Sequence, residues 1–172
     1  IDQRVDKDWK NTLLEELKSN PICVGLSCST GKQLIYAVET SRFVKENSNV
    51  PVVWGGVHPA TLPFETLENK YIDIIVSGEG DITFYELVKA LEKNQDLKNI
   101  KGIYYKENGE IVKTENRELI ENLDTLPELP FHLVNVRDYS SVNYIDGPSI
   151  DLMTSKGCPF KCGFCYNLYF NK

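Results

Sequence analysis

Residues 50–59, VPVVWGGVHP, decide the fold that this sequence predicts. The run up to Trp54 is apolar and has the length of one buried strand, which Gly55-Gly56 ends. Two other short apolar runs, 22–27 and 71–76, also end in small residues. Segments with apolar residues at helical spacing flank these runs, at 5–19, 32–46, 62–70 and 82–93. Short strands that alternate with helices predict βαβ units and a parallel sheet, which is an α/β fold.

The predicted helices carry more specific expectations about burial and capping. In the helix 32–46, the apolar stripe Leu34, Ile35, Val38 and Phe43 is expected to face the sheet. In the helix 82–93, the inward residues are expected to be Phe84, Leu87, Val88 and Leu91. Asp81 precedes that helix directly and is expected to be its N-cap.

Three loops of small residues follow the predicted strands. Because the carboxyl ends of parallel strands meet at one edge, a ligand is expected there. Glycine in such a loop lets a ligand approach the backbone closely. The candidate binding residues are Ser27, Ser29, Thr30 and Gly31 in the first loop, Gly55, Gly56 and His58 in the second, and Gly78, Glu79 and Gly80 in the third.

The chain changes character after residue 95. Asn108-Gly109 lies between two apolar stretches and is a strong signal for a β-hairpin. Pro127 and Pro130 lie among scattered apolar residues, which is typical of an ordered linker. The expected divisions are an α/β domain at 1–95, a hairpin extension at 96–122, a linker at 123–148 and the start of another domain at 149–172.

Composition excludes several classes of protein. The chain has 172 residues, of which 41% are hydrophobic and 26% are charged, as in ordinary globular proteins. Its net charge of −6 argues against a general nucleic-acid binder. No run approaches the roughly 20 apolar residues that a membrane span needs. The five cysteines occur without a segment that reads as a secretory signal, so a reducing cytoplasm is expected.

Cys158, Cys162 and Cys165 form the pattern Cys-x3-Cys-x2-Cys. Three thiolates on one tight loop suit an iron–sulfur cluster, and a 4Fe–4S cluster held by three cysteines keeps one iron open. A zinc knuckle is the alternative, but a closed zinc site needs four ligands, and His58 and His132 both lie upstream. A disulfide fits a reducing compartment less well.

The cysteine spacing resembles the radical S-adenosylmethionine family, whose motif is Cys-x3-Cys-x-aromatic-Cys. Phe164 occupies the aromatic position. The resemblance implies that the three cysteines hold a 4Fe–4S cluster, whose open iron binds S-adenosylmethionine and whose electron cleaves it to a 5′-deoxyadenosyl radical. It also implies that Phe164 packs near the cluster and the adenine. A flavodoxin or ferredoxin would donate the electron.

The first 95 residues resemble cobalamin-binding domains of the flavodoxin-like type. In one family pattern a serine precedes a Gly-Gly pair by 26–28 residues, and 27 residues separate Ser27 from Gly55-Gly56 here. The resemblance implies that these loops line the slot for the nucleotide tail of cobalamin. Two features depart from the pattern: its Ser-x-Leu is Ser27-Cys28-Ser29 here, and its Asp-x-His-x-x-Gly motif would precede residue 1. The first βα unit is therefore expected to be missing, and the lower axial ligand of cobalt stays open.

Together the two resemblances predict the N-terminal part of a cobalamin-dependent radical S-adenosylmethionine enzyme. It would methylate or cyclise an unreactive carbon, and residues 149–172 would be the first strand and cluster loop of a truncated (β/α) barrel. The fragment alone is expected to be inactive. Two alternatives stay open: a binding or sensor module with a structural metal loop, and a radical enzyme that has lost cobalamin.

Individual residues keep alternatives too. His58 either faces cobalamin or is a capping or surface residue. Glu79 either hydrogen-bonds a corrin amide or a partner domain, or it caps the following helix. Cys23 and Cys28 are expected to be buried small hydrophobes, with contact between Cys28 and cobalamin as the alternative.

Overall fold

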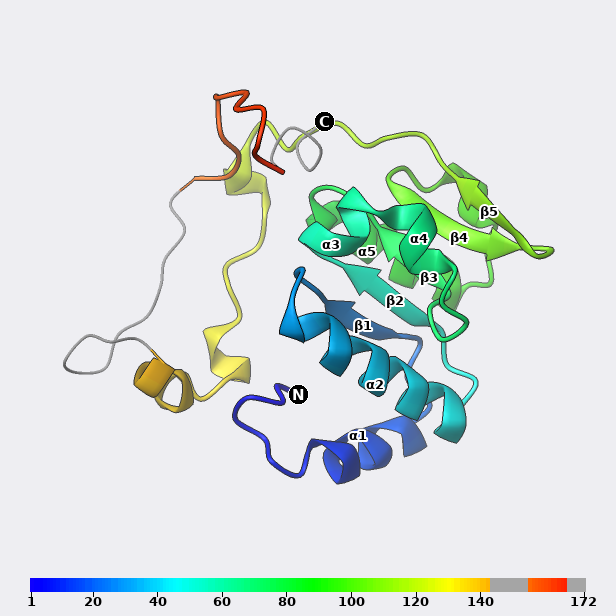
Figure 1. Ribbon diagram of the computed structural model, residues 1–172, viewed down its shortest axis with the longest axis vertical. Coiled ribbons are helices and arrows are strands. Elements are labelled where there is room, and N and C mark those ends of the chain that lie inside the picture. The colour runs from blue at the N-terminus through cyan, green and yellow to red at the C-terminus, as the bar shows by residue number, and fades with distance from the viewer. Residues whose placement is uncertain (143–154, 167–172) are drawn as a thin grey trace.

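The computed structural model describes residues 1–142 and 155–166 (Figure 1). Its helices are α1 (Trp9–Lys18), α2 (Lys32–Asn47), α3 (Val57–Thr61), α4 (Pro63–Leu67) and α5 (Gly80–Glu92). Its strands are β1 (Val24–Ser27), β2 (Val52–Gly55), β3 (Ile74–Val76), β4 (Ile103–Glu107) and β5 (Glu110–Lys113). Short 3-10 helices lie at Leu97–Asn99, Leu123–Thr125, Phe131–Leu133 and Val136–Val142.

The strands form one sheet in the order β1-β2-β3-β4-β5. β1, β2 and β3 are parallel, as the alternation of strands and helices predicts. β4 runs antiparallel to β3, and β5 runs antiparallel to β4. The hairpin expected as an extension therefore continues the sheet of the α/β domain. Its turn has positive φ at both Asn108 (53°) and Gly109 (85°), as a two-residue type I′ turn requires.

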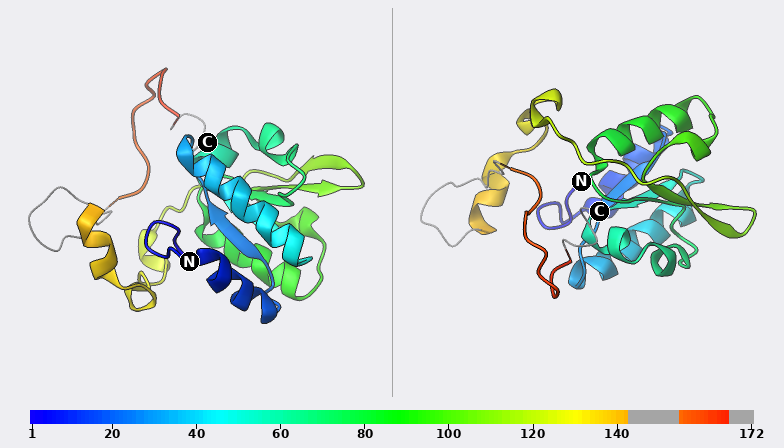
Figure 2. Two further views of the ribbon diagram at one scale, coloured as in Figure 1. Left: turned by 60° about the horizontal axis from the view of Figure 1, so that its bottom comes forward. Right: turned by 90° about the horizontal axis from the view of Figure 1, so that it is seen from above.

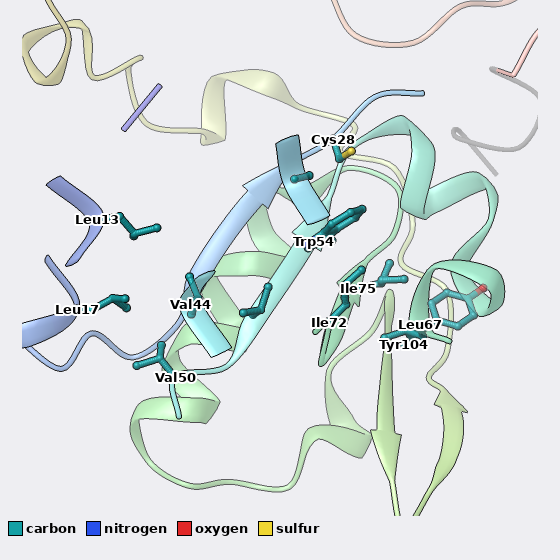
Figure 3. Close-up of a cluster of buried hydrophobic side chains, with 12 residues drawn as sticks. Leu13, Leu17, Cys28, Val44, Val50, Trp54, Leu67, Ile72, Ile75 and Tyr104 are labelled. Carbon is teal, nitrogen blue, oxygen red and sulfur yellow. The ribbon is translucent and has the colours of Figure 1, made fainter. Parts of the chain in front are cut away.

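The pleat divides the buried strand residues between two helical layers. On one face, Val52, Trp54 and Ile75 pack with side chains of α1, α2 and α4 in the cluster that Figure 3 shows. On the other face, Val53 and Val76 pack with Leu87 of α5. This alternation follows from the two-residue period of a strand. Both faces of the sheet are thus covered, as in other α/β domains.

The face of α2 that meets the sheet differs from the expected stripe. Ala37, Ser41 and Val44 are buried, whereas Ile35 is 69% exposed. Leu34, Val38 and Phe43 are partly buried beside the same core. Because residues advance by about 100° around a helix, Ala37, Ser41 and Val44 share a face that Ile35 does not. Ser41 belongs on this face because its Oγ accepts a 2.8 Å hydrogen bond from the buried Trp54 Nε1.

The beginnings of the later helices also differ from expectation. α5 begins at Gly80 with Glu79 as its N-cap, so Asp81 lies in the first turn and the expected Asp81 cap is wrong. Phe84, expected to point inward, is 37% exposed. Residues 57–61 form the unexpected helix α3, and the predicted helix 62–70 is the shorter α4, which Pro63 begins.

Residues 123–142, where the linker is expected, contain short 3-10 helices joined by backbone without regular secondary structure. Figures 1 and 2 show this segment standing away from the sheet. The rest of the expected linker and the expected strand at 149–153 lie outside the described residues. Within the described ranges, no helix combines the length and apolarity needed to cross a membrane.

Candidate functional site: the carboxyl edge of the sheet and the cysteine loop

The loops after β1, β2 and β3 gather at one edge because these strands are parallel. Ser27 at the end of β1 is the register partner of Gly55 at the end of β2. The interval between Ser27 and the double glycine therefore places these residues side by side on neighbouring strands. In Figure 1 the carboxyl edge lies at the ends of the β1 and β2 arrows, where α3 begins.

Backbone hydrogen bonds join the first two loops. Cys28 N donates to Gly55 O at 2.8 Å, and His58 N donates to Cys28 O at 3.2 Å. Gly56 has φ +97°, and a Cβ there would lie 2.7 Å from Cys28 O. Gly56 is therefore required by the close approach of the chain's own backbone.

Gly55 and Gly31 leave open space beside the backbone. A Cβ at Gly55 would meet only Val76 O, at 4.0 Å, and a Cβ at Gly31 would meet nothing within 4 Å. Gly31 also has φ +118°, a conformation that side chains rarely adopt. A ligand that approaches the backbone at this edge therefore has room at Gly55 and Gly31, whereas the Cβ direction of Gly56 is filled by Cys28.

A side-chain hydrogen bond connects the same two loops at the surface. Thr30 Oγ1 and His58 Nδ1 lie 3.2 Å apart, and the tautomer of His58 decides which of them donates. His58 is half-buried in the first turn of α3. The hydrogen bond to Thr30 orients the imidazole ring of His58. Neither interpretation of His58 from the sequence included this bond.

The two cysteines of the α/β domain are poor candidates for thiolate chemistry. Cys28 is 1% exposed, and Cys23 is partly buried. Burial raises the pKa of both thiols above the ordinary value, because a thiolate is less well solvated there. Cys28 packs in the core cluster at the end of β1 (Figure 3), in keeping with its expected role as a small hydrophobe.

Glu79 in the third loop binds another part of the same chain. Its Oε2 accepts a 2.8 Å hydrogen bond from Ile120 N, and its side chain makes no cap bond to α5. Arg117 holds the same outgoing segment, since its Nε donates to Thr83 Oγ1 at 2.7 Å and its Nη2 pairs with Glu86. The third loop therefore anchors the segment that leaves the hairpin. The Gly78 backbone has φ +75°, as this tight turn needs.

The three cysteines of the expected cluster lie on one surface loop. Cys158 and Cys162 are exposed, Cys165 is partly buried, and Cys165 N donates to Cys162 O at 3.0 Å. Phe164 is 95% exposed on this loop. Within residues 1–142 and 155–166, no three His, Cys, Asp or Glu side chains stand close enough to hold a metal ion. The donor set suits an iron–sulfur cluster, provided that the thiols converge when it binds.

An ion pair connects this loop to the α/β domain. Lys156 Nζ pairs with Asp81 Oδ2 in the first turn of α5. The two side chains are 28% and 43% exposed. In Figures 1 and 2 the segment 155–166, drawn in orange and red, lies beyond the carboxyl edge of the sheet. Sequence reasoning did not find this pair, because the two residues are 75 positions apart and both are ordinary surface charges.

Known proteins resemble both the α/β domain and most of the whole chain. The model of the B12 binding domain family matches residues 2–88. An uncharacterized methyltransferase of Pyrococcus horikoshii is 41% identical over 159 residues, which are 90% of this chain and 34% of the relative. The anaerobic magnesium-protoporphyrin IX monomethyl ester cyclase of Synechocystis is 33% identical over 147 residues, which are 84% of this chain and 28% of the relative.

A solved structure is also similar to this chain. The radical S-adenosylmethionine methyltransferase TsrM of Kitasatospora setae matches with a TM-score of 0.53 and 25% identity, over 63% of this chain and 22% of that chain. The chain thus spans about a third or less of the length of these known proteins. The sheet, the edge loops and the relatives of the chain all support the same family. The chain belongs to the B12-binding domain family, in the group that joins this domain to a radical S-adenosylmethionine domain.

Proposed function

We propose that this chain is the cobalamin-binding part and cluster loop of a radical S-adenosylmethionine enzyme that methylates an unreactive carbon. The observation that carries the proposal is the ion pair between Lys156 and Asp81, which places the cysteine loop beside the carboxyl edge of a B12-type sheet. The two expected cofactor sites then lie on one side of the protein. The substrate contacts belong to parts of the protein outside this chain.

Each part of the site has a defined task in this proposal. Cys158, Cys162 and Cys165 would hold a 4Fe–4S cluster, and Phe164 would pack on it once the loop is covered. Ser27, Ser29 and the open backbone at Gly31 and Gly55 would hold cobalamin at the edge. When bound, the cluster supplies an electron for the cleavage of S-adenosylmethionine, and cobalamin supplies a methyl group. The electron would come from a flavodoxin or ferredoxin, in a reducing compartment such as the cytoplasm.

Cyclisation is the second candidate reaction. The cyclase relative of Synechocystis supports it, while the more similar relative of Pyrococcus horikoshii and the TsrM structure support methylation. Both reactions would use the same residues of this chain, because both begin with abstraction of a hydrogen atom from carbon. The difference between them would lie in the groups that surround the substrate.

Metal and cobalamin analysis of one preparation tests the proposal. The full-length protein, reconstituted without oxygen, should hold about four iron and four sulfide per chain and one cobalamin. Cys162→Ala should lose the iron and sulfide and keep the cobalamin, because Cys162 lies on the separate cysteine loop. Zinc without sulfide in the wild-type protein would favour a structural metal loop. A full cluster without cobalamin would leave a radical enzyme that does not use it.

A further inference from the structure

We propose that the turn Glu79-Gly80-Asp81 is a docking point that sets where the cysteine loop lies relative to the cobalamin edge, with Lys156 as the positioning residue. This inference rests on the proposed function. It assigns a role to a contact that neither cofactor site contains. It also gives a role to Glu79, for which the sequence left a corrin contact, a partner-domain contact and a helix cap open.

The contacts of this turn carry the proposal. Asp81 pairs with Lys156, and Glu79 accepts a hydrogen bond from Ile120 N at 2.8 Å. The chain between Ile120 and Lys156 therefore leaves from one turn and returns to the same turn. The neighbouring carboxylates Glu79 and Asp81 therefore contact the chain on both sides of this interval.

The hairpin exit is fastened independently of Glu79. Arg117 Nη2 pairs with Glu86 of α5, and Arg117 Nε donates to Thr83 Oγ1, which is fully buried. Gly102 N donates to Glu115 O at 2.7 Å in the same region. The start of the linker is thus rigidly attached to α5. At the other end, Lys156 contacts the same turn through Asp81.

Lys156 is close enough to the cysteines to position them. Two residues of extended chain span about 7 Å, so the Cα of Cys158 lies within about that distance of the Lys156 Cα. The Lys156 side chain is 28% exposed, although the residue lies on an exposed loop with Gly157 and Phe160. The first turn of α5 favours a carboxylate, because the helix dipole is positive at its amino end. Asp81 is therefore a stable partner for the lysine.

Hydrogen exchange of residues 155–166 in the full-length protein tests the docking without any cofactor. Lys156→Met and Asp81→Asn should each raise exchange in this segment about two- to fivefold, the range expected for a partly exposed ion pair. Lys156→Arg should keep the wild-type rate, since it keeps the charge. Lys161→Met is the matched control, because Lys161 lies on the same loop and makes no ion pair within the described ranges. Equal exchange in all variants would overturn the docking point.

Pulsed EPR on the loaded protein tests the positioning itself. The reduced cluster and cob(II)alamin are both paramagnetic, so their separation is measurable in one sample. Lys156→Met should broaden the distribution of distances between the cluster and the cobalt. Lys156→Arg should show the wild-type distribution. An unchanged distribution in Lys156→Met would overturn the positioning role. If the proposed function were wrong, the wild-type protein would lack one of the two signals, while the hydrogen-exchange result would still decide whether the loop docks.

Discussion

The backbone of Cys28 occupies the space that a side chain on Gly56 would need. A Cβ at Gly56 would lie 2.7 Å from Cys28 O and 3.0 Å from Cys28 N, and Gly56 has φ +97°. Gly55, its neighbour, has no such contact, since the nearest atom to a Cβ there is 4.0 Å away. The two adjacent glycines therefore have different tasks: Gly56 lets the first two loops pack together, and Gly55 leaves the edge open.

Gly56→Ala should destabilise the domain whether or not a ligand is present. The methyl group meets backbone atoms that cannot rotate away, and the positive φ adds strain, so the free energy of unfolding should fall by at least about 2 kcal/mol. Gly55→Ala, the matched control, should change it by less than about 1 kcal/mol. Chemical denaturation of both variants measures this. Equal stability of the two variants would contradict the assignment.

Gly55→Trp should block cobalamin without unfolding the protein. The indole would project into the open space at the carboxyl edge, and the affinity for cobalamin should fall at least about tenfold, or 1.4 kcal/mol. A cobalamin titration of the full-length protein followed by absorbance measures this. Asn49→Trp, at the opposite edge of the sheet before β2, is the control and should bind normally. Normal binding by Gly55→Trp would place cobalamin elsewhere.

Ser41→Ala should leave the buried Trp54 indole without a hydrogen-bond acceptor. Both residues are at most 1% exposed, and the bond is 2.8 Å long. An unsatisfied buried donor costs about 1–3 kcal/mol of stability. The same change in a Trp54→Phe background should cost clearly less, because no indole N–H remains. Denaturation curves of the wild type, the two single variants and the double variant give the coupling energy. A value near zero would show that this hydrogen bond does not stabilise the domain.

Alkylation at pH 8 should separate the cysteines into two groups. The pKa of Cys28 and Cys23 is raised by burial, so at this pH they are largely protonated and react slowly as well as being shielded. Cys158 and Cys162 are exposed and should be modified first. Labelling with iodoacetamide followed by mass spectrometry should show Cys28 at least about tenfold slower than Cys158. Comparable rates would mean that the core around Cys28 opens readily.

The fold was largely predictable from local patterns. The runs that end at Ser27, Gly55 and Val76 are apolar and short, and Asn108-Gly109 has the two positive φ angles that its turn needs. The buried face of α2 was not predictable in this way. Its central position belongs to Ser41, whose small polar side chain is buried because Trp54 of β2 needs an acceptor.

The contacts of the site were less accessible to sequence reasoning. The spacing of Ser27 from Gly55 has a local explanation, since the two are register partners. The requirement for glycine at position 56 comes from its close contact with the Cys28 backbone. The role of Glu79 comes from its hydrogen bond to Ile120 N, far along the chain. Surface charges such as Asp81 and Lys156 have no pattern that reveals their partners, so only the folded chain brings them together.

The proposed function requires that Cys158, Cys162 and Cys165 hold the cluster that cleaves S-adenosylmethionine. The most direct measurement is the release of 5′-deoxyadenosine from S-adenosylmethionine by the reduced, anaerobically reconstituted full-length protein. We expect release that depends on the reductant and is lost in Cys162→Ala, while Cys28→Ala, a change at a buried thiol outside the loop, retains it. Absence of 5′-deoxyadenosine from a wild-type protein with an intact cluster would overturn the proposed radical chemistry.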